Sequence, residues 1–139
     1  MNYSCKVPCE KENLREIRAF IAEALASHGL DELQIGSLVL AIDEVCANLI
    51  IHGRQCNMHD TIQIDIEIPN KKGILFKIFD YGSDFDINKY QEPEIEEIIK
   101  SQRKGGVGLI LVKKIMDKIQ FIKENGRNVC HLYKKTNLK

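Results

Sequence analysis

Three polar stretches of the chain carry residue types that could bind a ligand, and the first lies in a long apolar segment. Glu44, Asn48 and His52 recur every four residues, so on a helix they form one stripe. The segment is otherwise apolar over most of its circumference, which favours a stripe lining a cleft over the solvent-facing side of a surface helix. A carboxylate and an amide oxygen are both hard ligands that suit Mg²⁺.

The second stretch, Asp80-Tyr81-Gly82, directly follows an apolar run that is typical of a strand. A carboxylate at a strand end can accept a hydrogen bond from an exocyclic amine inside a pocket. The following glycine, having no side chain, lets the backbone approach a ligand closely. The alternative is an ordinary Asp-x-Gly turn at the end of the strand.

The third stretch is Arg103-Lys104-Gly105-Gly106-Val107-Gly108-Leu109, ahead of a helical pattern. Closely spaced glycines before a helix leave backbone N–H groups free at the positive end of the helix dipole, which favours an anion. The two basic residues at its start add positive charge. The spacing is neither that of a Walker A loop nor that of a Rossmann fingerprint. A flexible linker is the alternative.

The elements that hold these stretches follow from hydrophobic periodicity. Strands are expected at 2–9 (an edge strand), 61–69, 74–79, 119–123 and 127–133, the last two joined by the hairpin signal Asn125-Gly126. Helices are expected at 13–28 (closed by Gly29), 32–52 (capped by Asp31 and deeply buried), 93–100 and 109–117. The regions 80–93 and 103–108 are expected to be loops. This order predicts one α+β domain over 1–139, a two-layer sandwich with a mixed, mostly antiparallel sheet and helices on one face.

Composition narrows the class of protein. Twenty Lys and Arg balance twenty Asp and Glu in 139 residues, so bulk charge favours neither nucleic acid nor an anionic membrane as a partner. No apolar run is long enough to cross a bilayer, and the N-terminus lacks the apolar core of a signal peptide. The five cysteines are odd in number and form no C-x-x-C pair, which favours reduced thiols. We therefore expect a cytoplasmic protein.

Taken together and in order, the three stretches resemble the N, G1 and G2 boxes of the Bergerat-type (GHKL, or histidine-kinase-like) ATPases. The resemblance rests on Glu44-x-x-x-Asn48, Asp80-x-Gly82 and Gly106-x-Gly108-Leu109, and it covers essentially the whole chain. Within the superfamily, the chain is most similar to the bacterial anti-sigma-factor serine/threonine kinases. The resemblance implies the Bergerat ATP-binding fold.

The resemblance also implies roles for individual residues. Asn48 would coordinate Mg²⁺, Asp80 would accept a hydrogen bond from the adenine amino group of ATP, and Gly82 would admit the base. Glu44 would be the general base that accepts the proton of the attacking hydroxyl. A lid and helix start would hold the phosphates, and the segment that carries them is Gly105, Gly106, Val107, Gly108 and Leu109. Arg103, or Lys104 if the register differs by one, would contact the γ-phosphate.

The function implied is that of an ATP-dependent serine/threonine protein kinase and anti-sigma factor, cytoplasmic and homodimeric. It would sequester a sigma factor and phosphorylate a STAS-type anti-anti-sigma protein, with helix 13–28 as the partner or dimer surface. Two alternatives stay open: a nucleotide-gated binding module without phosphoryl transfer, and the ATP-binding subunit of a histidine-kinase-like system.

Overall fold

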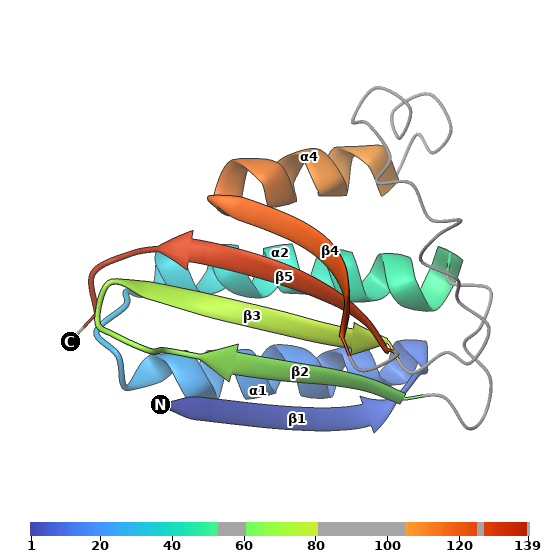
Figure 1. Cartoon of the computed structure of the whole chain (residues 1–139), viewed down its shortest axis with the longest axis horizontal. Coiled ribbons are helices and arrows are strands. Elements are labelled where there is room, and N and C mark those ends of the chain that lie inside the picture. Colours follow the sequence, from blue (N-terminus) through green and yellow to red (C-terminus); the bar gives the residue numbers. More distant parts are fainter. Residues whose placement is uncertain (53–60, 81–104, 125–126, 139) are drawn as a thin grey trace.

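The computed structural model describes residues 1–52, 61–80, 105–124 and 127–138, which form a five-stranded sheet covered on one face by helices (Figure 1). The strands are β1 (Asn2–Pro8), β2 (Thr61–Glu67), β3 (Gly73–Asp80), β4 (Lys118–Glu124) and β5 (Arg127–Lys135). The helices are the 3₁₀ turn η1 (Lys11–Asn13), α1 (Leu14–Ala26), α2 (Glu32–His52) and α4 (Gly105–Ile115). The predicted α+β sandwich is confirmed.

The sheet has the strand order β1-β2-β3-β5-β4, and every pairing in the described part of the chain is antiparallel. β1 lies at an edge as predicted, with Pro8 as its last residue, where a missing N–H is tolerated. β4 and β5 form the predicted hairpin, with Glu124 opposite Arg127; the turn residues 125–126 lie outside the described part. β3 is the central strand, so its end is fixed from both sides.

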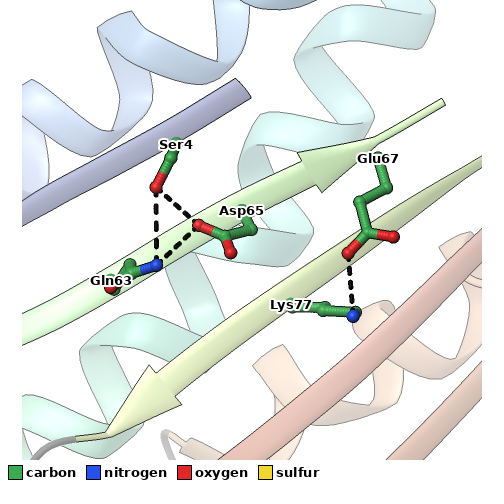
Figure 2. A network of polar contacts seen from close by, with 5 residues as sticks. All are labelled: Ser4, Gln63, Asp65, Glu67 and Lys77. Atoms are coloured by element: carbon green, nitrogen blue, oxygen red, sulfur yellow. Dashed lines mark hydrogen bonds and ion pairs between the residues drawn. The ribbon is translucent and has the colours of Figure 1, made fainter. Parts of the chain in front are cut away.

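Alternation along β2 sorts its side chains onto two faces. Ile62, Ile64 and Ile66 are fully buried against the helices, as the period-2 pattern predicts. On the opposite face, Asp65 accepts hydrogen bonds from Ser4 of β1 (2.6 Å) and from Gln63 (2.9 Å), as Figure 2 shows. One face of the sheet therefore belongs to the core, and the other carries a polar network.

The helix α1 presents one apolar side to the sheet and ends where the sequence predicts. Its buried residues are Leu14, Ile17, Ile21, Ala24 and Leu25. Gly29 follows the helix with a φ of 80°, a left-handed conformation that glycine adopts without steric cost. The amphipathic helix predicted over 13–28 is confirmed to within two residues.

The helix α2 begins with a reciprocal cap, as expected for Asp31. The Gln34 N–H donates to Asp31 Oδ1 (2.8 Å), and the Asp31 N–H donates to Gln34 Oε1 (3.0 Å). The expectation of deep burial all round is wrong for the first half of the helix: Leu33 is 84% exposed and Leu40 is 42% exposed. The helices form a single layer, so the side of α2 turned away from the sheet faces outward.

The segment from α4 to the end of β5 departs from the predicted bounds. The helix predicted from Leu109 to Asp117 begins four residues earlier, at Gly105, and ends at Ile115. It ends because the Asp117 N–H donates to Tyr133 of β5 (2.9 Å), which redirects the chain into β4. The helix predicted at 93–100 and most of the loop predicted at 80–93 lie outside the described residues.

The cysteines described by the structure differ in their bonding. Cys5, Cys46 and Cys130 are free thiols as expected, whereas Cys9 is disulfide-bonded, so the expectation of reduced thiols is wrong for that residue. No helix within the described ranges is both long enough and apolar enough to cross a bilayer.

Candidate functional site

The described parts of the three chemistry-bearing stretches lie at one end of the molecule. The last turns of α2, the last residue of β3 and the first turn of α4 lie at the same end of the sheet (Figure 1). α2 and α4 pack side by side in the helix layer. Segments separated by up to 60 residues in the sequence are therefore brought together by the sheet and its helix layer.

Two adjacent carboxylates on α2 have different partners. Asp43 Oδ1 forms an ion pair with Arg18 of α1 at 2.8 Å, and its side chain is only 21% exposed. Glu44 is half-buried and, within the described part of the chain, forms no hydrogen bond or ion pair. Successive helical residues point about 100° apart, so Asp43 turned toward α1 leaves Glu44 on a different side of α2. Glu44 is therefore the carboxylate that is free to act on a ligand.

Asn48 follows Glu44 by one helical turn, still inside α2, which continues to His52. The backbone spacing thus preserves the predicted stripe at i and i+4. Residues of this type at this spacing fit Mg²⁺, because both supply hard oxygen donors from one rigid helix.

Asp80 closes the central strand. Its backbone is in register with Ile62 of β2 on one side and with Asn128 of β5 on the other. A residue held by two neighbouring strands has a fixed backbone position, which a specificity-determining acceptor requires. The sequence placed Asp80 at a strand end, and the structure confirms that place.

The first turn of α4 contains the glycine-rich stretch itself. Residues 105–108 are helical, so the expected loop is wrong for these four residues. The first four N–H groups of a helix have no acceptor inside it, and here those groups belong to Gly105, Gly106, Val107 and Gly108. The positive end of the helix dipole lies at the same point. The anion-binding character inferred from the glycines is therefore carried by the helix start.

Some predicted site residues fall outside the described part of the chain. These are Gly82, Arg103 and Lys104. Leu109 lies within α4 by its backbone.

Two features of the site were not predicted. The Arg18–Asp43 pair joins α1 to α2 beside Glu44; the sequence contained both residues, but only the packing of the two helices pairs them. Cys46 is fully buried two residues after Glu44, and burial, followed by the charge of Asp43, raises the pKa of its thiol. Cys46 thus stays protonated and neutral, which excludes it as a nucleophile or metal ligand.

Comparison with known protein families shows to which family the chain belongs. Residues 7–134 match the family described as the histidine kinase-like ATPase domain. The chain belongs to this family. Membership in an ATPase domain family implies that the chain binds ATP, and the resemblance inferred from the motifs is confirmed.

The relatives of this histidine kinase-like ATPase domain include serine-protein kinases. Serine-protein kinase RsbW from Staphylococcus aureus strains JH9 and Newman is 29% identical over 126 residues, which cover 87% of this chain and 79% of the relative. A solved structure, the RsbU and RsbW domains of Rv1364c from Mycobacterium tuberculosis, superposes with a TM-score of 0.68 at 17% identity. That match covers 99% of this chain and 32% of the other, and it supports the fold alone.

Proposed function

We propose that this protein is an ATP-dependent serine/threonine protein kinase that acts as an anti-sigma factor. It phosphorylates a STAS-type anti-anti-sigma protein on Ser or Thr and sequesters a sigma factor, and its nucleotide state selects the partner. The similarity to serine-protein kinase RsbW supports the kinase class.

The observation that carries the proposal is the carboxylate of Glu44, which has no partner among the described residues, beside the carboxylate of Asp43, which is paired with Arg18. Nucleotide binding alone requires no general base, whereas phosphoryl transfer to a hydroxyl gains from one. A carboxylate that is not engaged by these residues is available to accept the proton of an incoming Ser or Thr hydroxyl.

In the proposed reaction, the substrate hydroxyl oxygen forms a bond to the γ-phosphorus of ATP while the bond from that phosphorus to the ADP oxygen breaks. The hydroxyl proton passes to Glu44. The free N–H groups at the start of α4 stabilise the negative charge of the phosphate oxygens, and Arg103 or Lys104 adds a cationic contact. Asp80 selects adenine by accepting a hydrogen bond from its amino group.

Asn48 is the proposed ligand of Mg²⁺. The amide oxygen suits a cation that retains several waters, and the carboxylate of Glu44 lies one turn away on the same helix. When bound, Mg²⁺ neutralises phosphate charge. Asn48 itself holds the ion in place relative to the helix.

Partner binding is assigned to α1 and its neighbourhood, by analogy with the family. A homodimer and a cytoplasmic location are proposed on the same basis. The exposed Arg18 side chain, 45% accessible, places a cation on this surface while it also contacts α2.

The decisive experiment incubates the purified protein with γ-labelled ATP, Mg²⁺ and candidate STAS proteins. Wild type is expected to transfer label to a partner Ser or Thr. Glu44→Gln should bind ATP but transfer label roughly 10²- to 10⁴-fold more slowly, because the general base is lost. The matched control, Asp43→Asn, should retain transfer, because the Asp43 carboxylate contacts Arg18 and is not the proposed base.

The outcomes separate the alternatives. Unchanged transfer by Glu44→Gln rejects the general-base role. Bound ATP without label on any partner favours the nucleotide-gated module. Acid-labile label on a partner histidine favours the histidine-kinase-like system.

A further inference from the structure

Exposed lysines gather at the end of the molecule opposite the nucleotide site. They lie on the turn between β2 and β3, on the last turn of α4, and at the adjoining ends of β4 and β5, all at the end where both termini lie (Figure 1). Six of them are exposed, and together they are called the lysine pole: Lys71, Lys72, Lys113, Lys114, Lys118 and Lys135.

The backbone fixes these lysines close together. Gly73, next to Lys72, is in register with Lys135, and Thr136 and Leu138 donate backbone hydrogen bonds to the carbonyls of Lys72 (3.0 Å) and Lys71 (2.8 Å). On the other side of β5, Lys118 pairs with Tyr133, next to the end of α4. The pole is therefore a rigid surface assembled from four segments.

The charges of the pole are not neutralised within the described part of the chain. None of the six side chains forms an ion pair there. Asp117 is the acidic residue on these segments, and its Oδ2 already accepts the backbone N–H of Lys135 at 2.7 Å. The start of α2 at the same end carries Asp31 and Glu32, and Asp31 is engaged in the helix cap.

Lys134, a lysine next to the pole, has a structural role that explains its position, whereas most lysines of the pole have none. Lys134 Nζ donates to the carbonyl of Ile115 (2.8 Å), which satisfies an end group of α4. Lys113 and Lys114 lie in the last turn of α4, where their positive charges interact favourably with the negative end of the helix dipole. Lys71, Lys72, Lys118 and Lys135 contact no helix end in this way, and their charge is available to a partner.

The composition of the pole indicates which anion it fits. Arginine, whose planar fork suits phosphates, is absent from these segments. The one aromatic residue on them, Tyr133, is half-buried, so no exposed ring is available to stack on a base. Flexible ammonium groups spread over a surface suit dispersed carboxylates, which attract over several ångströms without fixed geometry.

We propose that the lysine pole is a docking surface for an acidic segment of a partner protein. The 21-residue helix α2 runs from this end to the nucleotide site, so the two surfaces are about 30 Å apart. A partner held at the pole leaves the nucleotide site open. The proposal goes beyond the proposed kinase activity and holds whether or not the protein transfers phosphate.

The test measures binding of a fluorescent oligoglutamate peptide by anisotropy, without nucleotide, at low and at physiological ionic strength. Wild type should bind, and binding should weaken with salt. The variant Lys72→Glu/Lys118→Glu/Lys135→Glu should bind about tenfold more weakly. The single variant Lys118→Glu should also bind more weakly than wild type. Its matched control, Lys123→Glu, changes the net charge equally at an exposed position near the other end of β4 and should bind as wild type does.

Circular dichroism checks that the variants fold, and glutamine replacements at the same three lysines serve if the charge-reversed triple variant does not. Equal losses in Lys118→Glu and Lys123→Glu would overturn the proposal, because bulk charge would then explain binding. Tighter binding of wild type to phosphatidylserine-containing vesicles or to duplex DNA than to the peptide would overturn it as well. Failure here leaves the labelled-ATP experiment unaffected, since no nucleotide is used.

Discussion

At the scale of single residues, the two neighbouring carboxylates of α2 have different roles: one joins two helices, and the other is the proposed general base. Asp43 is held by Arg18 at 2.8 Å and joins two helices, whereas Glu44 has no partner in the described part of the chain. Among the described residues, the packing of α1 on α2 thus engages Asp43 and leaves Glu44 available as the proposed general base.

His131 provides a prediction at the same scale. It lies on β5 opposite Lys77, and its Nε2 atom is buried and has no hydrogen-bond partner in the part of the chain that the structure describes. Burial, followed by the positive charge of Lys77, lowers the pKa of His131, although Glu124 and Glu67 partly oppose the shift. The unfolded chain therefore binds the proton more readily than the folded protein.

The stability that depends on neutral His131 is complete above the ordinary histidine pKa of about 6.5 and is lost as the pH falls through the lower folded value. The urea midpoint of wild type should consequently fall more between neutral and mildly acidic pH than that of His131→Gln. Parallel pH profiles for the two proteins would show that His131 does not contribute.

At the scale of elements, α2 is a buried helix only on the side that faces the sheet. Its start is fixed by the Asp31–Gln34 cap, and its outward side carries Leu33, Gly36 and Leu40 at exposed positions. A Cβ added at Gly36 would meet nothing within 4 Å. The glycine is therefore not required there by packing.

Gly36→Ala should accordingly stabilise the protein by about 0.5–1 kcal/mol, because alanine loses less backbone entropy than glycine when a helix forms. Urea unfolding measures the gain. The same substitution at Gly73 serves as the control: its Cβ would come 2.7 Å from two ring carbons of Tyr133, so Gly73→Ala should destabilise the protein. A loss of stability in Gly36→Ala would contradict the description of this side of α2 as open.

At the scale of the whole molecule, one hydrophobic core joins the described elements. It contains residues from α1, α2 and α4 together with inward-facing residues of the strands, among them Ile21, Ile42, Phe76, Val112 and Leu132. Elements that share a core unfold together. This core supports our proposal that residues 1–139 form a single domain.

Calorimetry should therefore show one thermal transition. Mg-ATP at about a hundred times its dissociation constant should stabilise the folded state by about 2.7 kcal/mol and raise the Tm by roughly 8 °C. Mg-GTP should raise the Tm less, because guanine has a carbonyl group where adenine has the amino group that the proposed acceptor Asp80 would bind. Two transitions would contradict a single domain, and equal shifts would contradict the role of Asp80.

Local patterns in the sequence predicted most of the elements, because they depend on neighbours along the chain. Alternating isoleucines predicted β2, the spacing of apolar residues predicted α1, and Asp31 predicted the start of α2. The three motifs also predicted the family.

The sequence by itself determined the kinds of element and the residue types at the site, since periodicity, caps and motif spacing are local properties. The tertiary structure alone decided that Asp43 is paired and Glu44 free, that the helix after the glycines begins at Gly105, and that six scattered lysines share one pole. Each of these depends on which distant segments pack together. That choice is made by burial of the common core and by the register of the sheet.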